Sequence, residues 1–114
     1  MPSFDAIRLR HMREAAAAAV EMAAGHERPE LSSNRMLAMA LTRCLEILGE
    51  AASKMSPPVR LRFPAIPFAK IVSMRNRLNH AYFDVDLDVV WTTVTEDLPA
   101  LLPALDAALA EIDR

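Results

Sequence analysis

The stretch SSNRMLAMALTRCLEILGEAAS, residues 32–53, decides the fold of this chain. Its apolar side chains recur every three or four positions, which places them on one face of an α-helix, and most of its charged side chains fall elsewhere. Ser32 or Ser33 is a suitable N-cap for this helix. The face that we expect to be buried consists of Leu37, Leu41, Cys44, Leu45, Leu48 and Ala52.

The composition of the whole chain favours helices packed on helices. Hydrophobic residues make up 53% of the 114 residues, there are only 2 glycines, and alanine, leucine and methionine prevail over β-branched and aromatic residues. This length suits one domain with one core. We therefore expect residues 1–114 to form a single all-α domain, an up-and-down bundle of four to five helices.

Prolines and glycine divide the first two thirds of the chain. A first helix over residues 4–24 is followed by a loop at 26–31. Several prolines interrupt residues 56–66, which predicts a long connection that cannot be helical throughout. Because proline suits the first turn of a helix, a third helix is expected from Pro67 to about Tyr82.

The last third begins with an alternation of acidic and apolar residues. A calcium-binding loop starting at Asp84 would need glycine at its sixth position and glutamate at its twelfth, but valine and threonine stand there. We therefore expect no metal site, and interpret Asp84 or Asp86 as the N-cap of a fourth helix. Prolines predict a break near Asp97 and a fifth helix from about Pro99.

The cellular location is also constrained by the sequence. Cys44 is the only cysteine, so an intramolecular disulfide is excluded, and a thiol on an apolar helix face is usually buried and inert. The alanine-rich run at 15–20 is much shorter than the roughly 20 residues that span a bilayer, and it does not resemble a secretory leader. We expect a cytoplasmic protein.

Positive charge is concentrated in the middle of the chain, although the formal net charge is -2. Residues 54–82 carry 6 basic and no acidic side chains, whereas residues 83–114 carry 1 basic and 8 acidic. A surface that binds phosphates, with Lys70 and Arg77 as contacts, is one interpretation. The other is a solvated face neutralised by acids of the C-terminal third or of a partner. The six basic residues are Lys54, Arg60, Arg62, Lys70, Arg75 and Arg77.

The motif MRNRLNHAY, residues 74–82, concentrates the side chains suited to phosphodiester chemistry. Arg75 supplies a permanently charged forked donor, His80 can exchange a proton near neutral pH, and the Tyr82 hydroxyl can be modified. The blander alternative is that Arg75 pairs with Asp84 or Asp86 while His80 caps a helix.

A straight helix does not bring Arg75 and His80 together. At about 100° per residue they lie about 140° apart, whereas Arg75 and Tyr82 nearly coincide. Either the helix distorts near His80, or a second copy of the chain completes the site. We favour the second, because a two-fold axis would bring both motifs to one cleft.

The chain resembles the HepT-like branch of the HEPN superfamily, which is marked by an arginine, four to six residues, a histidine, any residue and a tyrosine. Ala81, where the branch often has glycine, and the proline-rich loop before the motif depart from the pattern. The segments that carry the resemblance are Leu48-Gly49-Glu50-Ala51, Ile66-Pro67, Ile71, Met74-Arg75-Asn76, His80-Ala81-Tyr82, Val85-Asp86, Val90-Trp91 and Asp97-Leu98-Pro99.

This resemblance implies a helical homodimer with both motifs in a shared cleft. It implies a ribonuclease toxin, with no metal or other cofactor, and an MNT-type nucleotidyltransferase antitoxin that attaches AMP to the motif tyrosine. Arg75 and His80 would then be catalytic, Asn76 supporting and Tyr82 the modification site. A pure interaction module, a nucleotide-binding domain that cuts nothing and, least favoured, a DNA-binding regulator remain the alternatives.

Overall fold

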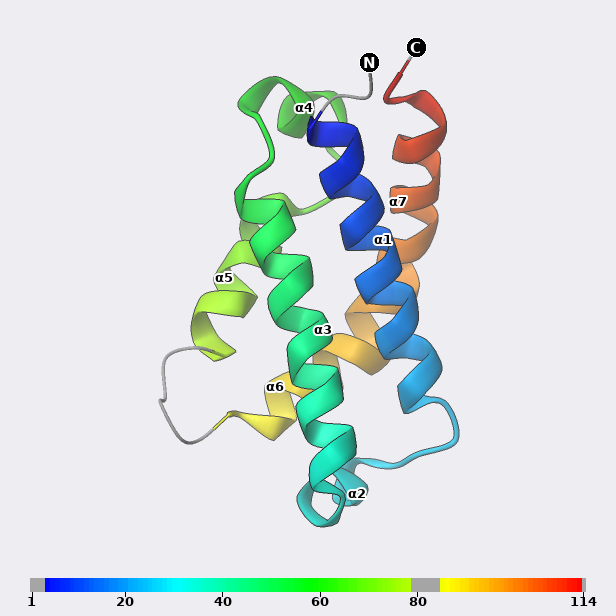
Figure 1. Cartoon of the computed structure of the whole chain (residues 1–114), viewed down its shortest axis with the longest axis vertical. Helices are drawn as coiled ribbons and strands as arrows, with labels where there is room; N and C mark the ends of the chain where they lie inside the picture. Colours follow the sequence, from blue (N-terminus) through cyan, green and yellow to red (C-terminus); the bar gives the residue numbers. More distant parts are fainter. Residues whose placement is uncertain (1–3, 79–84, 114) are drawn as a thin grey trace.

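Two long helices, α1 (Phe4–Ala23) and α3 (Arg35–Ser53), lie side by side and antiparallel in a computed structural model that describes residues 4–78 and 85–113 (Figure 1). Buried alanines of α1, Ala15, Ala16 and Ala19 among them, leave room for the leucines of α3 to pack closely. The face of α3 predicted from the sequence is buried, except that Cys44 is half-buried, and this burial raises the pKa of its thiol.

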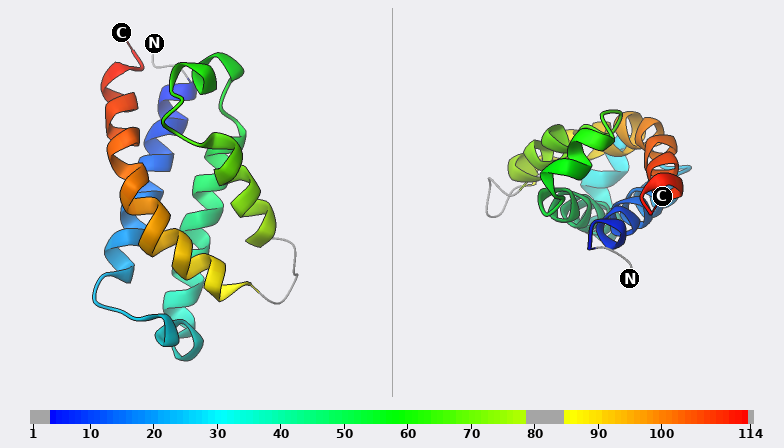
Figure 2. Two further views of the ribbon diagram at one scale, coloured as in Figure 1. Left: turned by 180° about the vertical axis from the view of Figure 1, so that it is seen from behind. Right: turned by 90° about the horizontal axis from the view of Figure 1, so that it is seen from above.

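The bundle is completed by α5 (Phe68–Leu78) and by the continuous helical segment of α6 (Leu87–Thr92), η1 (Thr93–Asp97) and α7 (Leu98–Glu111). Seen from behind, this segment rises across the bundle opposite α5, and α7 packs along α1 (Figure 2). The described residues form no strand, and the helices run up and down. The all-α fold class is confirmed.

Two segments expected to be loops contain short helices, α2 (Arg28–Ser33) and α4 (Pro57–Arg62). Both carry prolines in the first turn, where a missing N–H costs nothing. The backbone N–H of Glu27 also donates to the Glu30 carboxylate at 3.2 Å. The predicted serine cap of α3 was wrong, since Ser32 and Ser33 end α2 and Asn34 accepts from the Leu37 N–H at 3.0 Å.

The helix break predicted near Asp97 is a π-helical turn and not a gap. Pro99 has no N–H to offer the carbonyl of Thr95, and the N–H of Leu98 reaches back five residues to Thr93. Upstream, Asp86 is the cap of α6, accepting from the N–H groups of two residues at 3.1 and 3.2 Å. Among the described helices, none has the length and apolar character needed to cross a membrane.

Candidate active site

Arg75 lies on the face of α5 that packs against α3. Ile71 and Leu78, one turn before and after it, are buried in the core. The side chain of Arg75 retains 21% of its exposure, so its guanidinium lies at the edge of the helix interface. The arginine is thus held by packing and still accessible to a ligand.

Gly49 makes this packing feasible. A Cβ atom at residue 49 would lie 2.4 Å from the Cβ and 2.9 Å from the Cγ of Arg75. Real carbon atoms do not approach so closely, so the stem of Arg75 occupies the place that a side chain at 49 would take. Glycine is required here for close approach, at its usual cost to helix stability.

Glu50 holds the far end of the same side chain. Its Oε2 lies 2.6 Å from Nη1 of Arg75, and its Oε1 lies 3.1 Å from Nζ of Lys54. The hydrogen bond and charge of Lys54, followed by Arg75, lower the pKa of Glu50. Glu50 is therefore a carboxylate near neutral pH and positions Arg75, and it is unsuited to donating a proton.

The guanidinium of Arg75 is not saturated by these contacts. Nη2 donates to Oδ1 of Asn76 at 3.2 Å, which brings the predicted supporting residue into contact with Arg75. The Nε atom is buried and has no hydrogen-bond partner among the described residues. A buried donor without a partner is unusual in a protein interior.

The other two motif residues, His80 and Tyr82, lie outside the described residues. The predicted extension of the third helix to Tyr82 lies there too, since α5 is described as far as Leu78. Of the two aspartates considered as partners of Arg75, Asp84 also lies outside the described residues, and Asp86 does not pair with Arg75. Arg75 pairs with Glu50, while Asp86 caps α6.

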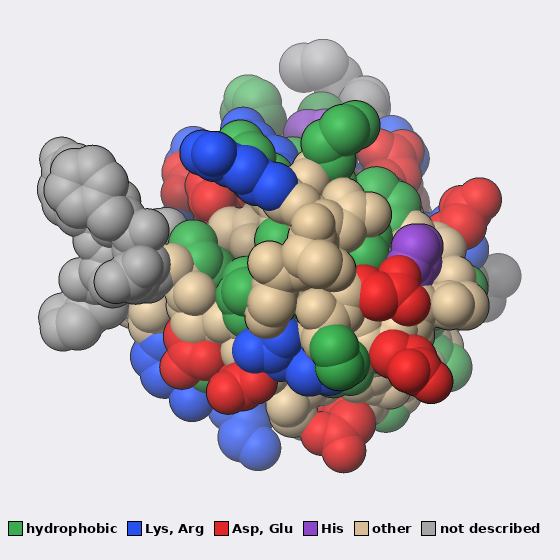
Figure 3. Space-filling view, turned by 90° about the horizontal axis from the view of Figure 1, so that it is seen from below, with side chains coloured by type: hydrophobic (Ala, Val, Ile, Leu, Met, Phe, Trp, Pro, Cys, Tyr) green, Lys and Arg blue, Asp and Glu red, His purple; other side chains and the backbone are tan. Residues whose placement is uncertain are grey.

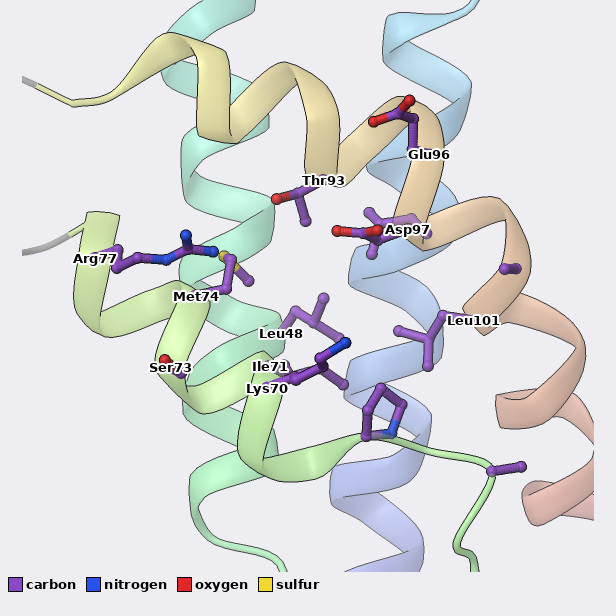
Figure 4. Close-up of a pocket in the computed structure, with 14 residues that line it drawn as sticks. Leu48, Lys70, Ile71, Ser73, Met74, Arg77, Thr93, Glu96, Asp97 and Leu101 are labelled. Atoms are coloured by element: carbon purple, nitrogen blue, oxygen red, sulfur yellow. The ribbon is translucent and has the colours of Figure 1, made fainter.

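Lys70 and Arg77 lie on a different face of α5. They are about 140° and 160° around the helix from Arg75. They line a cavity between α5 and the start of α7, which they share with Glu96 and Asp97 (Figure 4). The structure therefore does not bring the predicted phosphate contacts together with Arg75.

Two further arginines of the basic segment have structural partners. Arg60 donates through Nη2 to the carbonyl of Ala52 at 3.0 Å, and Arg62 through Nη1 to that of Ile112 at 3.0 Å, so both satisfy carbonyls at helix ends. Seen from the end that carries α2, basic and acidic side chains are intermixed (Figure 3). This end is therefore not one continuous cationic surface.

Sequence reasoning gave no individual role to Gly49, Glu50 and Lys54. An isolated glycine inside a strongly periodic helix was the available signal, because such a glycine costs stability and usually has a packing reason.

Among residues 4–78 and 85–113, no group of three or more histidines, cysteines or acids could hold a metal ion.

The chain belongs to the ribonuclease HepT-like family, whose model matches residues 12–108. A "Probable ribonuclease HepT" of Thermococcus cleftensis is 45% identical over 62 residues, which cover 54% of this chain and 56% of that protein. A "Putative RNase" of Methanocaldococcus jannaschii is 34% identical over 76% of this chain and 72% of its own length. No solved structure matches the chain. The family expected from the motif is confirmed, and the chain is of the ribonuclease class of enzymes.

Proposed function

We propose that this chain is the toxin of a toxin–antitoxin pair, an endoribonuclease that cleaves RNA without a metal ion. The observation that carries the proposal is the guanidinium of Arg75, fixed by Gly49, Glu50 and Asn76 and left with unused donors. Arg75 stands three residues before the described end of α5, and His80 follows it by five positions in the sequence. Family membership supports RNA as the substrate.

In this mechanism the ribose 2'-oxygen attacks the adjacent phosphorus. The bond from phosphorus to the 5'-oxygen breaks, which leaves a 2',3'-cyclic phosphate and a 5'-hydroxyl. His80 takes the proton from the 2'-hydroxyl or returns one to the leaving oxygen, and Arg75 stabilises the charge that builds on the phosphate oxygens. General acid-base catalysis of this kind is typically worth about 10²- to 10⁴-fold in rate, and one well-placed donor about 10²- to 10³-fold.

A homodimer completes the site in this proposal. The outer face of α3 exposes Met36 at 83% and Met39 at 62%, which is unusual for large apolar side chains. Arg43 and Glu50 lie about one turn before and after the exposed Ile47. Antiparallel pairing of two copies about Ile47 would therefore bring Arg43 of one close to Glu50 of the other, at the edge of both sites.

Regulation by an MNT-type nucleotidyltransferase would act on the motif tyrosine. AMP attached to Tyr82 adds a bulky anion that competes with RNA for Arg75. The near coincidence of the two positions on a helical wheel supports this step. The second candidate function is a nucleotide-binding or interaction module that cuts nothing, which the cavity lined by Lys70 and Arg77 favours.

Expression of the chain in a bacterial host tests the choice between enzyme and module. We expect toxicity that disappears with His80→Ala, while the purified variant keeps the oligomeric state and thermal stability of the parent. Asn34→Ala, which removes a helix cap far from the motif, controls for mild destabilisation. Toxicity that survives His80→Ala would refute the catalytic proposal.

A further inference from the structure

A cavity of about 610 Å³ lies between α5 and the η1 to α7 segment. This volume is within the range of about 300–1,000 Å³ typical of small-molecule sites. Its apolar lining comes from both walls and from α3, and it includes Leu48, Ile71, Met74, Leu98 and Leu101.

Opposite charges line the two sides of this cavity. Lys70 and Arg77 extend into it from α5, and Asp97 faces them from η1, with Glu96 at the rim (Figure 4). None of these four side chains forms an ion pair or hydrogen bond with another described residue. Lys70, Arg77 and Asp97 thus face one space without pairing with each other. This arrangement suits a ligand that carries both an anionic group and hydrogen-bond donors.

The π-helical turn η1 positions the carboxylate of Asp97. Asp97 is the last residue of η1, and the extra residue in this turn changes the direction of the side chains that follow. The hydroxyl groups of Thr93 and Thr95 donate to the carbonyls of Val89 and Trp91, each at 2.7 Å, and bonds of this kind often bend a helix. Such turns occur frequently at functional sites.

We infer that this cavity is a subsite for a guanine nucleotide of the RNA, an inference that rests on the proposed function. Lys70 and Arg77 bind the phosphate, and the base lies on the apolar lining. Asp97 accepts from the N1–H and the N2 amino group of guanine. A carboxylate only accepts, and guanine alone among the four RNA bases offers two adjacent donors on its Watson–Crick edge.

The subsite is separate from the place of cleavage. Lys70 and Arg77 lie more than a third of a turn around α5 from Arg75, so the guanine is a nucleotide recognised away from the scissile phosphate. The cavity would select the sequence of the RNA, while Arg75 and His80 act on its backbone.

Isothermal titration of the full chain with GMP, IMP and AMP tests the inference without RNA or cleavage. GMP should bind at least tenfold more tightly than AMP, and IMP, which lacks the N2 amino group, should fall between them. Asp97→Asn should remove the preference for GMP, and Lys70→Ala with Arg77→Ala should weaken GMP and AMP alike. Asp106→Asn, an exposed carboxylate of α7 that pairs with Arg13, is the matched control.

Equal affinities for GMP and AMP, no binding of GMP, or an unchanged preference in Asp97→Asn would each overturn the inference. A change in oligomeric state of Asp97→Asn, with GMP binding unchanged, would show that the charged walls pair with a second copy instead. A chain that binds GMP selectively but cleaves no RNA would refute the proposed function alone. Cleavage without selective binding would refute only the subsite.

Discussion

The Cβ of Arg75 lies 2.4 Å from the position that a Cβ at Gly49 would occupy. The first atom met is the rigid base of the arginine side chain and not its flexible end. Any side chain at 49 would therefore push α3 and α5 apart. Because Glu50 is the next residue of α3, this one contact also sets the distance at which Glu50 meets the guanidinium.

Gly49→Ala should lower the free energy of unfolding by about 1–3 kcal/mol, the usual cost of overpacking. Helix propensity alone would make Gly49→Ala stabilising, because alanine is the better helix former by about 1 kcal/mol. A loss of stability would therefore report the packing effect. RNA cleavage should fall as well, because the guanidinium is displaced from Glu50. Urea denaturation and an RNA cleavage assay measure the two effects.

The same substitution in an Arg75→Gly background provides the control. Without a Cβ at 75 the overlap disappears, and Gly49→Ala should then be neutral or stabilising. An equal destabilisation in both backgrounds would show that the contact with Arg75 is not the cause.

Glu50→Gln should reduce kcat for RNA cleavage about 10- to 100-fold, the range expected when a catalytic group loses its orientation. Stability should change little, since ion pairs of exposed carboxylates contribute little to stability. Glu50→Asp should restore part of the activity. Glu46→Gln, on the same helix and paired with Arg43, should have no effect on kcat.

The carboxyl group of Glu50 should titrate below the ordinary range for glutamate. Lys54 is the main cause, so Lys54→Ala should raise this pKa. Because folding lowers this pKa, the ionised Glu50 stabilises the folded state at pH values above the pKa of glutamate in the unfolded chain. This stabilisation is lost as the pH falls through the pKa of Glu50 in the folded chain. The pKa of Glu50 can be measured by following its carboxyl chemical shift by NMR as the pH is changed. An unchanged pKa in Lys54→Ala would show that Lys54 is not the cause.

Asp86→Ala should destabilise the chain by about 1 kcal/mol, the usual cost of losing an N-cap. Asp86 accepts two backbone hydrogen bonds at the start of α6. Asp86→Asn keeps the cap and should be close to neutral in thermal denaturation. Comparable losses in both variants would argue for a charge effect instead.

The sequence was sufficient for α3 because the periodicity of its apolar residues is strong. Residues 37–52 place apolar groups at helical spacing, and tertiary packing reinforces that pattern. The short helices α2 and α4 were missed because each has six residues and carries proline in its first turn, and proline indicates a loop as readily as a first turn.

The candidate site was predicted only in part, for a related reason. The motif identified Arg75, but motif spacing says nothing about which neighbouring helix a side chain meets. Contacts of Arg75 with Gly49 and Glu50 join residues about 25 positions apart and depend on how α3 packs against α5. Lys70 and Arg77 were grouped with Arg75 by charge, although helical geometry separates them.

End-group analysis of RNA cleaved by the purified chain in EDTA tests the central claim most directly. The account predicts 2',3'-cyclic phosphate and 5'-hydroxyl ends for the parent chain, and almost no cleavage by Arg75→Ala at unchanged secondary structure. Cleavage by Arg75→Ala at the parental rate, or products with 5'-phosphate and 3'-hydroxyl ends that require a divalent cation, would contradict it.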